Sequence, residues 1–260
     1  MVRLLTLDAV PSVIELSAAA GWNQTPEDWS RMIRLEPEGC FCIERDGRVV
    51  ATATLLCFGA ELAWIGMVLT HRDYQRRGFA RRLMSAAVDT ARGRGVRSVK
   101  LDATDQGHAL YESFGFVDEQ PIERWRREPR PAEPEPAATG PVPHALDREA
   151  CGVDRSRFID ALPGPVRACD EAYALTRPGA RANYAGPIVA RHPRDADRLL
   201  ASLLDDGAWY LDLLPSNQAA RIIASEHGFA PVRHLTRMRL GQPIQTRDDY
   251  VFGIAGFEAG

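Results

Sequence analysis

Apolar and polar residues in the first half of the chain alternate between helical and strand-like spacing. Within residues 8–20 the apolar side chains recur every three or four positions, which predicts an amphipathic helix. Thr25 and Pro26 are typical of the start of a second helix, because Thr25 suits the N-cap and acidic residues follow. Residues 40–44 and 49–58 are apolar runs separated by an Asp-Gly turn, which predicts a β-hairpin. We therefore expect two helices followed by antiparallel strands.

A strand, a basic turn with a glycine and a helix follow one another at residues 64–93. Residues 75–80 read Gln-Arg-Arg-Gly-Phe-Ala, between a strand-like run at 64–70 and a helix at about 81–93. The first turn of a helix has four N–H groups without intrahelical acceptors, and its dipole favours an anion. Gly78 lets the backbone adopt positive φ or approach a ligand closely. The pattern predicts a site for a diphosphate.

The turn by itself is also compatible with an ordinary connection between a strand and a helix. Two common phosphate-binding motifs are excluded, because neither G-x-x-x-x-G-K-[ST] nor G-x-G-x-x-G occurs. Downstream, residues 98–103 are strand-like, and a short helix over 108–114 is closed by Gly115 before another strand.

The second half resembles a degenerate copy of the first. Six prolines between residues 128 and 144 indicate an extended linker. Residues 145–260 then repeat the order of strand, helix, strand and helix, at residues 184–191, 195–204, 209–214 and 217–226. Gly115-Phe116 and Gly228-Phe229 lie 113 positions apart in matching contexts, which favours an internal repeat. Residues 250–260 are strand-like, and they either complete the second sheet or cross to the first half.

Composition narrows the class of protein. The 260 residues are 45% hydrophobic and 26% charged, as in ordinary globular proteins, and the net charge is −3. This charge gives no general attraction to nucleic acid or to anionic membranes, so neither is an expected partner. Five cysteines without C-x-x-C spacing, no secretory signal and no apolar span favour a cytoplasmic protein with free thiols. No histidine and cysteine spacing predicts a metal site.

Together, the basic turn and Leu110-Tyr111-Glu112-Ser113-Phe114-Gly115-Phe116 resemble the GNAT superfamily of N-acetyltransferases. Residues 75–80 correspond to its R/Q-x-x-G-x-G/A loop, and residues 110–116 to its L-Y-E-x-x-G-F segment. Residues 146–155 and the second repeat resemble the C-terminal domain of a bacterial two-domain subgroup. The resemblance implies tandem α/β (α+β) GNAT-like folds, each with a mixed, mostly antiparallel sheet flanked by helices. It implies a catalytic domain at 1–127, a linker at 128–144 and a degenerate domain at 145–260.

The resemblance also implies direct transfer of an acetyl group from acetyl-CoA to an amine in a ternary complex. Tyr111 would be the general acid that protonates the leaving thiolate. The expected acetyl-CoA-binding residues are Val68, Leu69, Thr70, Gln75, Arg76, Arg77, Gly78, Phe79, Ala80, Arg81 and Thr104. Trp22, Asn23 and Trp29 are candidates for the acceptor site, although each also fits a core position. The acceptor would be a small-molecule, peptide or protein amine, and a homodimer is possible.

Some assignments stay open at this level. Arg76 occupies a position that is often glycine, so it fits only if its backbone angles are ordinary there. Glu61, His71, Asp102 and His108 are alternative general bases, and His71 also suits a capping role. The second copy has Ala224 in place of Tyr111, and a proline and an aspartate near its loop, so we expect it to bind no acetyl-CoA. The alternative function is a non-catalytic acyl-CoA-binding sensor or scaffold.

Overall fold

The computed structural model describes residues 1–132, 137–169 and 171–260. The predicted linker at 128–144 therefore falls partly, at 133–136, outside the described residues. In chain order the first half forms β1 (Arg3–Leu4), η1 (Leu7–Ala9), α1 (Val10–Ala19), α2 (Pro26–Leu35), β2 (Cys40–Arg45), β3 (Arg48–Phe58), β4 (Leu62–Thr70), η2 (Arg72–Tyr74), α3 (Phe79–Gly93), β5 (Ser98–Ala103), α4 (Asp105–Glu112) and β6 (Val117–Arg127).

The second half begins with two short helices and continues as alternating strands and helices. Its elements are α5 (His144–Cys151), α6 (Ser156–Ile159), β7 (Arg167–Cys169), β8 (Ala172–Arg177), β9 (Asn183–Ala190), α7 (Pro193–Leu203), β10 (Trp209–Leu213), α8 (Gln218–Glu226), β11 (Ala230–Gly241), η3 (Asp248–Tyr250) and β12 (Val251–Gly253).

Local sequence signals account for the start of the fold. Thr25 caps α2 in a capping box, in which its side chain accepts from the Asp28 N–H and the Asp28 carboxylate accepts from the Thr25 N–H. The β2–β3 turn has Asp46 and Gly47 at φ of 52° and 75°, the left-handed conformation that an Asp-Gly turn of a hairpin requires. Both predictions, the helix start and the hairpin, are confirmed.

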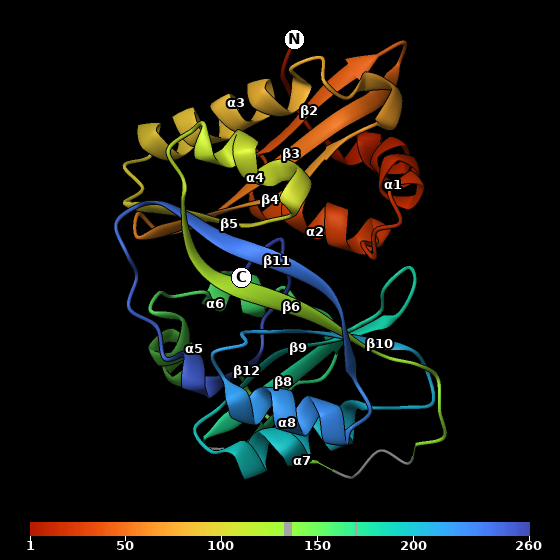
Figure 1. Ribbon diagram of the computed structural model, residues 1–260, viewed down its shortest axis with the longest axis vertical. Coiled ribbons are helices and arrows are strands. Elements are labelled where there is room, and N and C mark those ends of the chain that lie inside the picture. The colour runs from red at the N-terminus through yellow and green to blue at the C-terminus, as the bar shows by residue number, and fades with distance from the viewer. Residues whose placement is uncertain (133–136, 170) are drawn as a thin grey trace.

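One mixed, mostly antiparallel sheet runs through both halves of the chain. Its strands lie in the order β1-β2-β3-β4-β5-β11-β6-β10-β9-β8-β7, and β12 pairs with β9. Figure 1 shows β11 and β6 crossing the middle of the molecule, with α1–α4 on one side of them and α7 and α8 on the other. The two parallel pairs are β4 with β5 and β9 with β10, and each is joined by a helix, α3 or α7. The predicted fold class is confirmed.

The two halves exchange their last long strands. β6 of the first half pairs with β10 and β11 of the second, whereas β11 pairs with β5 of the first half. The repeat of 113 residues superimposes residues 117–127 on residues 230–240, so β6 and β11 are equivalent strands. β6 of the first half therefore lies beside β10 of the second half, and β11 of the second half lies beside β5 of the first half. A boundary at residue 127 follows the end of β6 along the chain, while the hydrogen-bonded sheet continues across it.

Each exchanged strand carries an arginine that pairs with an aspartate of the other half. Arg237 on β11 binds Asp102 on β5 through Nε and Nη2, at 2.9 and 3.1 Å. Arg124 on β6 binds Asp212 on β10 in the same bidentate way, at 2.7 Å for both contacts. Both aspartates are fully buried, so the charges are neutralised by specific pairing rather than by water. The two pairs are related by the internal repeat.

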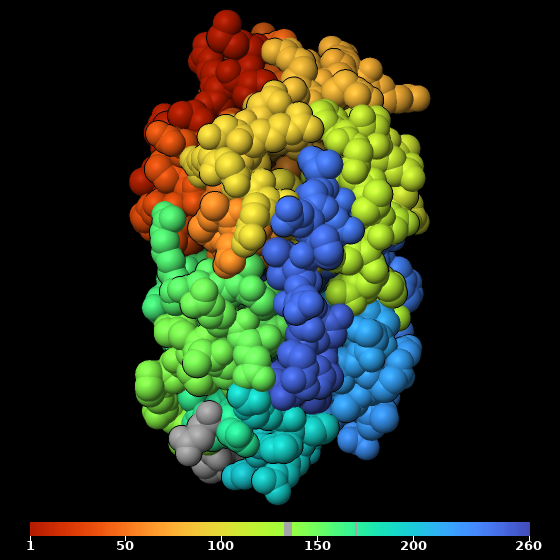
Figure 2. Space-filling view, turned by 90° about the vertical axis from the view of Figure 1, so that its left-hand side faces the viewer, coloured from red at the N-terminus to blue at the C-terminus, as the bar shows by residue number. Residues whose placement is uncertain are grey.

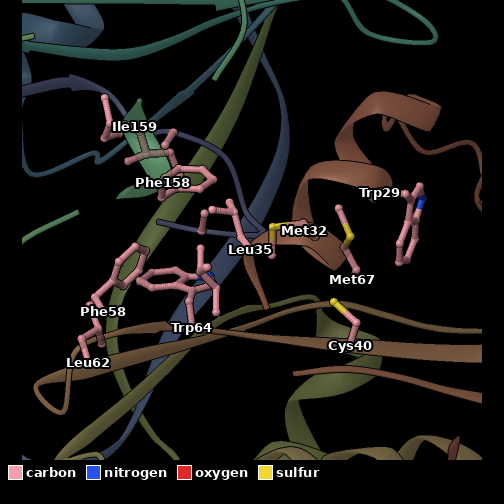
Figure 3. Close-up of a cluster of buried hydrophobic side chains, with 14 of the residues drawn as sticks. Trp29, Met32, Leu35, Cys40, Phe58, Leu62, Trp64, Met67, Phe158 and Ile159 are labelled. Carbon is pink, nitrogen blue, oxygen red and sulfur yellow. The ribbon is translucent and has the colours of Figure 1, made fainter. Parts of the chain in front are cut away.

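Side chains alternate between two cores across the sheet of the first half. Cys40 and Cys42 face α1 and α2, whereas Phe41 faces α3. The predicted common face of the two cysteines is confirmed. The core under α1 and α2 also takes in residues of the second half, and the Phe58 and Phe158 rings meet edge to face at 6.2 Å. Figure 3 shows these side chains gathered between the halves.

The last residues bridge the two halves, so both readings of residues 250–260 are realised. β12 extends the second sheet by pairing with β9, and the backbone carbonyl of Phe257 then accepts a hydrogen bond from Trp64 Nε1 at 2.9 Å. Gly66 on β4 lies against Glu258, where an added Cβ would come within 2.7 Å of the Glu258 Cα. Figure 2 shows that the blue chain that follows β11 also lies across the boundary between the halves.

No described helix combines the length and apolar character that crossing a bilayer requires.

The described ends of the linker contact the second half. The Arg130 N–H donates to the Asp206 carbonyl, and the Ala168 N–H donates to the Ala138 carbonyl.

Candidate active site

The basic turn between β4 and α3 adopts a backbone shaped for an anion. Gly78 is the N-cap of α3 in the left-handed conformation, with φ of 77°, and a Cβ there would meet no atom within 4 Å. Arg76 also has positive φ, at 59°. The condition set for Arg76, ordinary backbone angles, is therefore not met, and the turn accommodates this arginine at positive φ. A non-glycine residue held in this region costs about 1–3 kcal/mol, a strain that proteins concentrate at ligand-binding turns.

Six successive backbone N–H groups, those of residues 76–81, donate to no acceptor among the described residues. The first N–H of α3 that finds an intrahelical acceptor belongs to Arg82, which donates to the Gly78 carbonyl at 3.1 Å. Alternating backbone conformations followed by a helix N-terminus form an anion nest. The exposed arginines on either side add positive charge. The turn therefore has the donors and the charge to hold a diphosphate.

A cleft of about 690 Å³ runs from this turn along the end of β4. β4 and β5 pair only from Leu62 to Trp64, and a bulge at Met67, with φ of 48°, turns β4 away from its neighbour beyond that point. Thr70 lines the cleft with a buried Oγ1 that has no hydrogen-bond partner in the described chain. This hydroxyl is therefore available to a hydrogen-bond partner in the cleft.

Ten of the eleven expected acetyl-CoA-binding residues line this cleft, namely Val68, Leu69, Thr70, Gln75, Arg76, Gly78, Phe79, Ala80, Arg81 and Thr104. Arg77 is the exception, because its guanidinium lies over the Tyr74 ring, 5.1 Å from the ring centroid. Sequence reasoning missed Tyr74 in η2 and Gln106, Gly107 and Leu110 in α4, which also line the cleft. For the three α4 residues, their position next to Tyr111 in the same helix was the available signal.

Tyr111 stands where this cleft meets a second pocket, and it lines both. Its side chain is 8% exposed, and burial raises the pKa of Tyr111 to about 12, so the phenol is neutral at ordinary pH. Gly107, one turn earlier in α4, makes room for the ring. A Cβ at this glycine would lie 2.8 Å from Tyr111 Cε2 and 3.2 Å from its hydroxyl oxygen. The phenol is therefore a neutral proton donor with a fixed position.

The second pocket is built by both halves of the chain. From the first half it takes the loop between α1 and α2, with Trp22 and Asn23, and the β4 bulge. From the second half it takes Arg233, Leu235 and Phe257. Sequence reasoning missed these three residues, because the strand exchange brings Arg233 and Leu235 to the first half and the segment after β12 brings Phe257 there. The pocket shares Val68, Thr104 and Tyr111 with the cleft, so the two cavities adjoin at these residues.

The three acceptor-site candidates have different roles in the structure. Trp22 lines the pocket. Asn23 lines it too, yet its side chain is bonded to the second half: Oδ1 accepts from the N–H groups of Arg181 and Ala182, and Nδ2 donates to the Ala182 carbonyl. Trp29 is fully buried in the core, where its Nε1 donates to Ser17, and Figure 3 shows it among the core side chains. Trp29 therefore does not reach the pocket.

Of the four candidate bases, Asp102 alone lines the pocket. It is held by Arg237 in the bidentate pair, and burial raises the pKa of this carboxyl above its ordinary value despite the facing guanidinium. His71 caps η2 by accepting from the Asp73 N–H, as the capping alternative expects. Glu61 pairs with Arg97, and His108 pairs with Asp118, whose carboxylate raises the pKa of this histidine. No three potential metal ligands gather anywhere in the described ranges.

The equivalent place in the second half is filled by the chain itself. β9 pairs with β10 over three residues, as β4 does with β5, and the equivalence of Asp212 with Asp102 makes Ile188 and Val189 the counterparts of Val68 and Leu69. These two residues of β9 pair with β12. Ala224, the counterpart of Tyr111, is fully buried. A segment of backbone therefore lies where the first half has its open cleft.

Comparisons with known proteins agree with this architecture. The family model described as Acetyltransferase (GNAT) family matches residues 10–116, and one described as Acetyltransferase (GNAT) domain matches residues 144–253. A curated relative, the uncharacterized N-acetyltransferase YitH of Bacillus subtilis, is 28% identical over 107 residues, which are 41% of this chain. The match spans 37% of that protein's length.

Solved structures with the same fold extend over both halves. A putative acetyltransferase from Pyrococcus horikoshii has a TM-score of 0.89 at 25% identity and aligns with 100% of this chain and 95% of its own. A tandem GNAT protein from the clavulanic acid biosynthesis pathway has a TM-score of 0.61 at 16% identity, over 94% of this chain and 99% of its own. The second likeness is one of fold alone.

Proposed function

This chain belongs to the GNAT superfamily of acetyltransferases, with one family match in each half, and from this premise we propose that it is an acetyl-CoA-dependent N-acetyltransferase. The first half, residues 1–127, would be the catalytic domain, and residues 145–260 a silent domain that completes the acceptor pocket. The observation that carries the proposal is the junction of cleft and pocket at Tyr111.

The cofactor cleft offers a distinct set of contacts to each part of acetyl-CoA. The free N–H groups of residues 76–81 would hold the pyrophosphate. The backbone of residues 68–70, where β4 has left β5, would pair with the pantetheine arm in the manner of an added strand. Acetyl-CoA supplies an activated acyl group as its thioester. These contacts would place that thioester beside Tyr111.

The protein's own contribution would be positioning and proton transfer. An amine in the second pocket would lie against the same three residues that line the end of the cleft. Because the protein would hold both reactants in place, acyl transfer would become an effectively unimolecular step. The Tyr111 phenol would donate its proton toward the departing sulfur. Since Asp102 is engaged by Arg237, the amine would lose its proton to water in the open pocket before attack.

Calorimetric titration with acetyl-CoA tests the binding part of this proposal. We expect micromolar-range binding by the wild type and at least a tenfold loss in Gly78→Glu, because a carboxylate would enter the anion nest. Gly95→Glu is the matched control, since Gly95 also has positive φ, at 69°, and open space, near the other end of α3. Both variants place a glutamate at a position of positive φ. Equal Kd values of the two variants for acetyl-CoA would therefore refute binding of the diphosphate by the anion nest.

Turnover separates the enzyme from a non-catalytic acyl-CoA sensor. A screen of amines with a thiol-release readout, run with protein that binds acetyl-CoA, should find a substrate whose turnover depends on Tyr111. A protein that binds acetyl-CoA and acetylates no amine would instead support the sensor.

A further inference from the structure

Building on the proposed acetyl transfer, we propose that the acceptor is an amine that also carries a carboxylate, and that Arg233 of the second half binds this carboxylate. Arg233 lies on β11 and lines the acceptor pocket together with Tyr111. The pocket, at about 120 Å³, is much smaller than the cofactor cleft of about 690 Å³. This difference favours a small acceptor, such as a free amino acid.

The charges that line the pocket leave one guanidinium unpaired. Arg124 is neutralised by Asp212, and Asp102 by Arg237, each through two hydrogen bonds. The Arg233 side chain forms no salt bridge and no hydrogen bond with any described residue, although its backbone is part of the β11–β6 ladder. The pocket therefore carries one surplus positive charge, contributed by Arg233. A cationic acceptor would be repelled, whereas an anionic group would be attracted.

The backbone of β11 is irregular at Arg233, which is solvent-exposed and lines the pocket at its open side. A bulge between Pro231 and Arg233 adds Val232 to the strand, and Arg233 comes to lie directly opposite Arg124 on β6. Like charges directly opposite one another on paired strands destabilise a sheet. Partial burial, and after it the positive charge of Arg124, lower the pKa of Arg233. Bulges are common beside active sites, where they re-aim a side chain.

The internal repeat shows that the fold itself does not require two facing arginines. The equivalent of the pair of Arg233 and Arg124 is the pair of Gln120 and Arg237, which also lie opposite each other on β6 and β11. There the arginine bound to an aspartate faces a neutral amide. The sheet accepts a neutral residue at this position, so the charge of Arg233 points to a ligand.

The surroundings suit a compact zwitterion. Trp22, Leu235 and Phe257 offer apolar walls, and the planar guanidinium of an arginine binds a carboxylate through two parallel hydrogen bonds. The amine end would then lie toward Tyr111 and the carboxylate end toward Arg233.

Two matched sets of acceptors test this inference: the twenty free amino acids, and the corresponding amino acid amides, which lack the carboxylate. Each set is incubated with the protein and acetyl-CoA, and acetylated products are identified by mass spectrometry. We expect acetylation of at least one free amino acid, with kcat/KM at least tenfold above that of its amide. Preference for the amides overturns the inference. Acetylation of neither set, by protein that binds acetyl-CoA, also overturns it.

Arg233→Gln separates a direct role of this arginine from a structural one. We expect kcat/KM for the free amino acid to fall about 10- to 100-fold, mainly through KM, which is the range for losing a hydrogen-bonded charge pair. The rate with the amide and the Kd for acetyl-CoA should not change, and Arg233→Lys should recover part of the loss. The melting temperature should not fall, because the substitution relieves the repulsion from Arg124.

Arg194→Gln is the control of equal charge change, since the Arg194 side chain is 82% exposed on α7. It should leave every rate as in the wild type. An equal loss for amino acid and amide in Arg233→Gln would refute a carboxylate contact. Absence of acetyl-CoA binding by the wild type would instead refute the proposed function, and the acceptor inference with it.

Discussion

Replacing Tyr111 with phenylalanine removes one hydroxyl from the junction of cleft and pocket. Burial raises the pKa of Tyr111 to about 12, whereas a thiol has a reference pKa of about 8.5. Complete transfer of the proton to a free thiolate would therefore be uphill by roughly 3.5 units, or about 5 kcal/mol. The phenol must act mainly as a hydrogen-bond donor to the charge that develops on sulfur. Such a bond contributes about 1.5–3 kcal/mol, which corresponds to about 10- to 150-fold in rate.

We expect Tyr111→Phe to lower kcat by about 10- to 150-fold and to leave the calorimetric Kd for acetyl-CoA unchanged. Between pH 6 and 10 the kcat profile should keep its shape, because the phenol stays protonated throughout. Tyr74→Phe is the matched control, since Tyr74 lines the cleft near the basic turn, away from the junction. A kcat for Tyr111→Phe within about threefold of the wild type would refute the assigned role.

Three further outcomes follow from the geometry. Gly107→Ala places a Cβ 2.8 Å from the Tyr111 ring, and the resulting displacement should reduce kcat by about 100-fold, while the Kd for acetyl-CoA changes less. Asp102→Asn leaves the buried Arg237 without a counter-charge, which should cost about 3–5 kcal/mol and lower the melting temperature in calorimetry by roughly 6–20 °C. A shift below 3 °C would contradict the assigned role of the pair. Alkylation of the native protein at pH 8 should modify Cys169 first by peptide mapping, because it is exposed and burial raises the pKa of the other four thiols.

The sequence predicts the local parts of the site because their geometry depends on neighbours in the chain. The basic turn, the N-terminus of α3 and Tyr111 on α4 are each defined by a few adjacent residues. Thr25 and the Asp-Gly turn are local signals of the same kind. Arg76 is a partial exception, since positive φ at a non-glycine residue is imposed by the surrounding structure rather than by its own preference.

The strand exchange lies beyond reach of the sequence pattern. The alternation of apolar and polar residues in β6 and β11 predicts which face of a sheet each residue occupies. This alternation does not depend on which strand lies alongside, so it cannot identify the neighbouring strand. Arg233 reads as a solvated strand residue until the bulge and the exchange place it beside Tyr111. Trp29 is the opposite case, since it was a candidate for the acceptor site and lies in the core. Its spacing to Met32 and Ile33 is that of a buried helical face.

The strand exchange also governs how the protein is made on the ribosome. β5 pairs early with β4 on one edge, but its other edge pairs only with β11, whose last residue, Gly241, is translated 138 residues after Ala103 (241 − 103). At a translation rate of about 5–20 residues per second, that edge of β5 stays unpaired for roughly 7–28 s. An unpaired strand edge can pair with another chain and so lead to aggregation. Fully buried in the finished fold, Asp102 presents an unpaired charge on the waiting edge, which opposes pairing with another chain until Arg237 arrives.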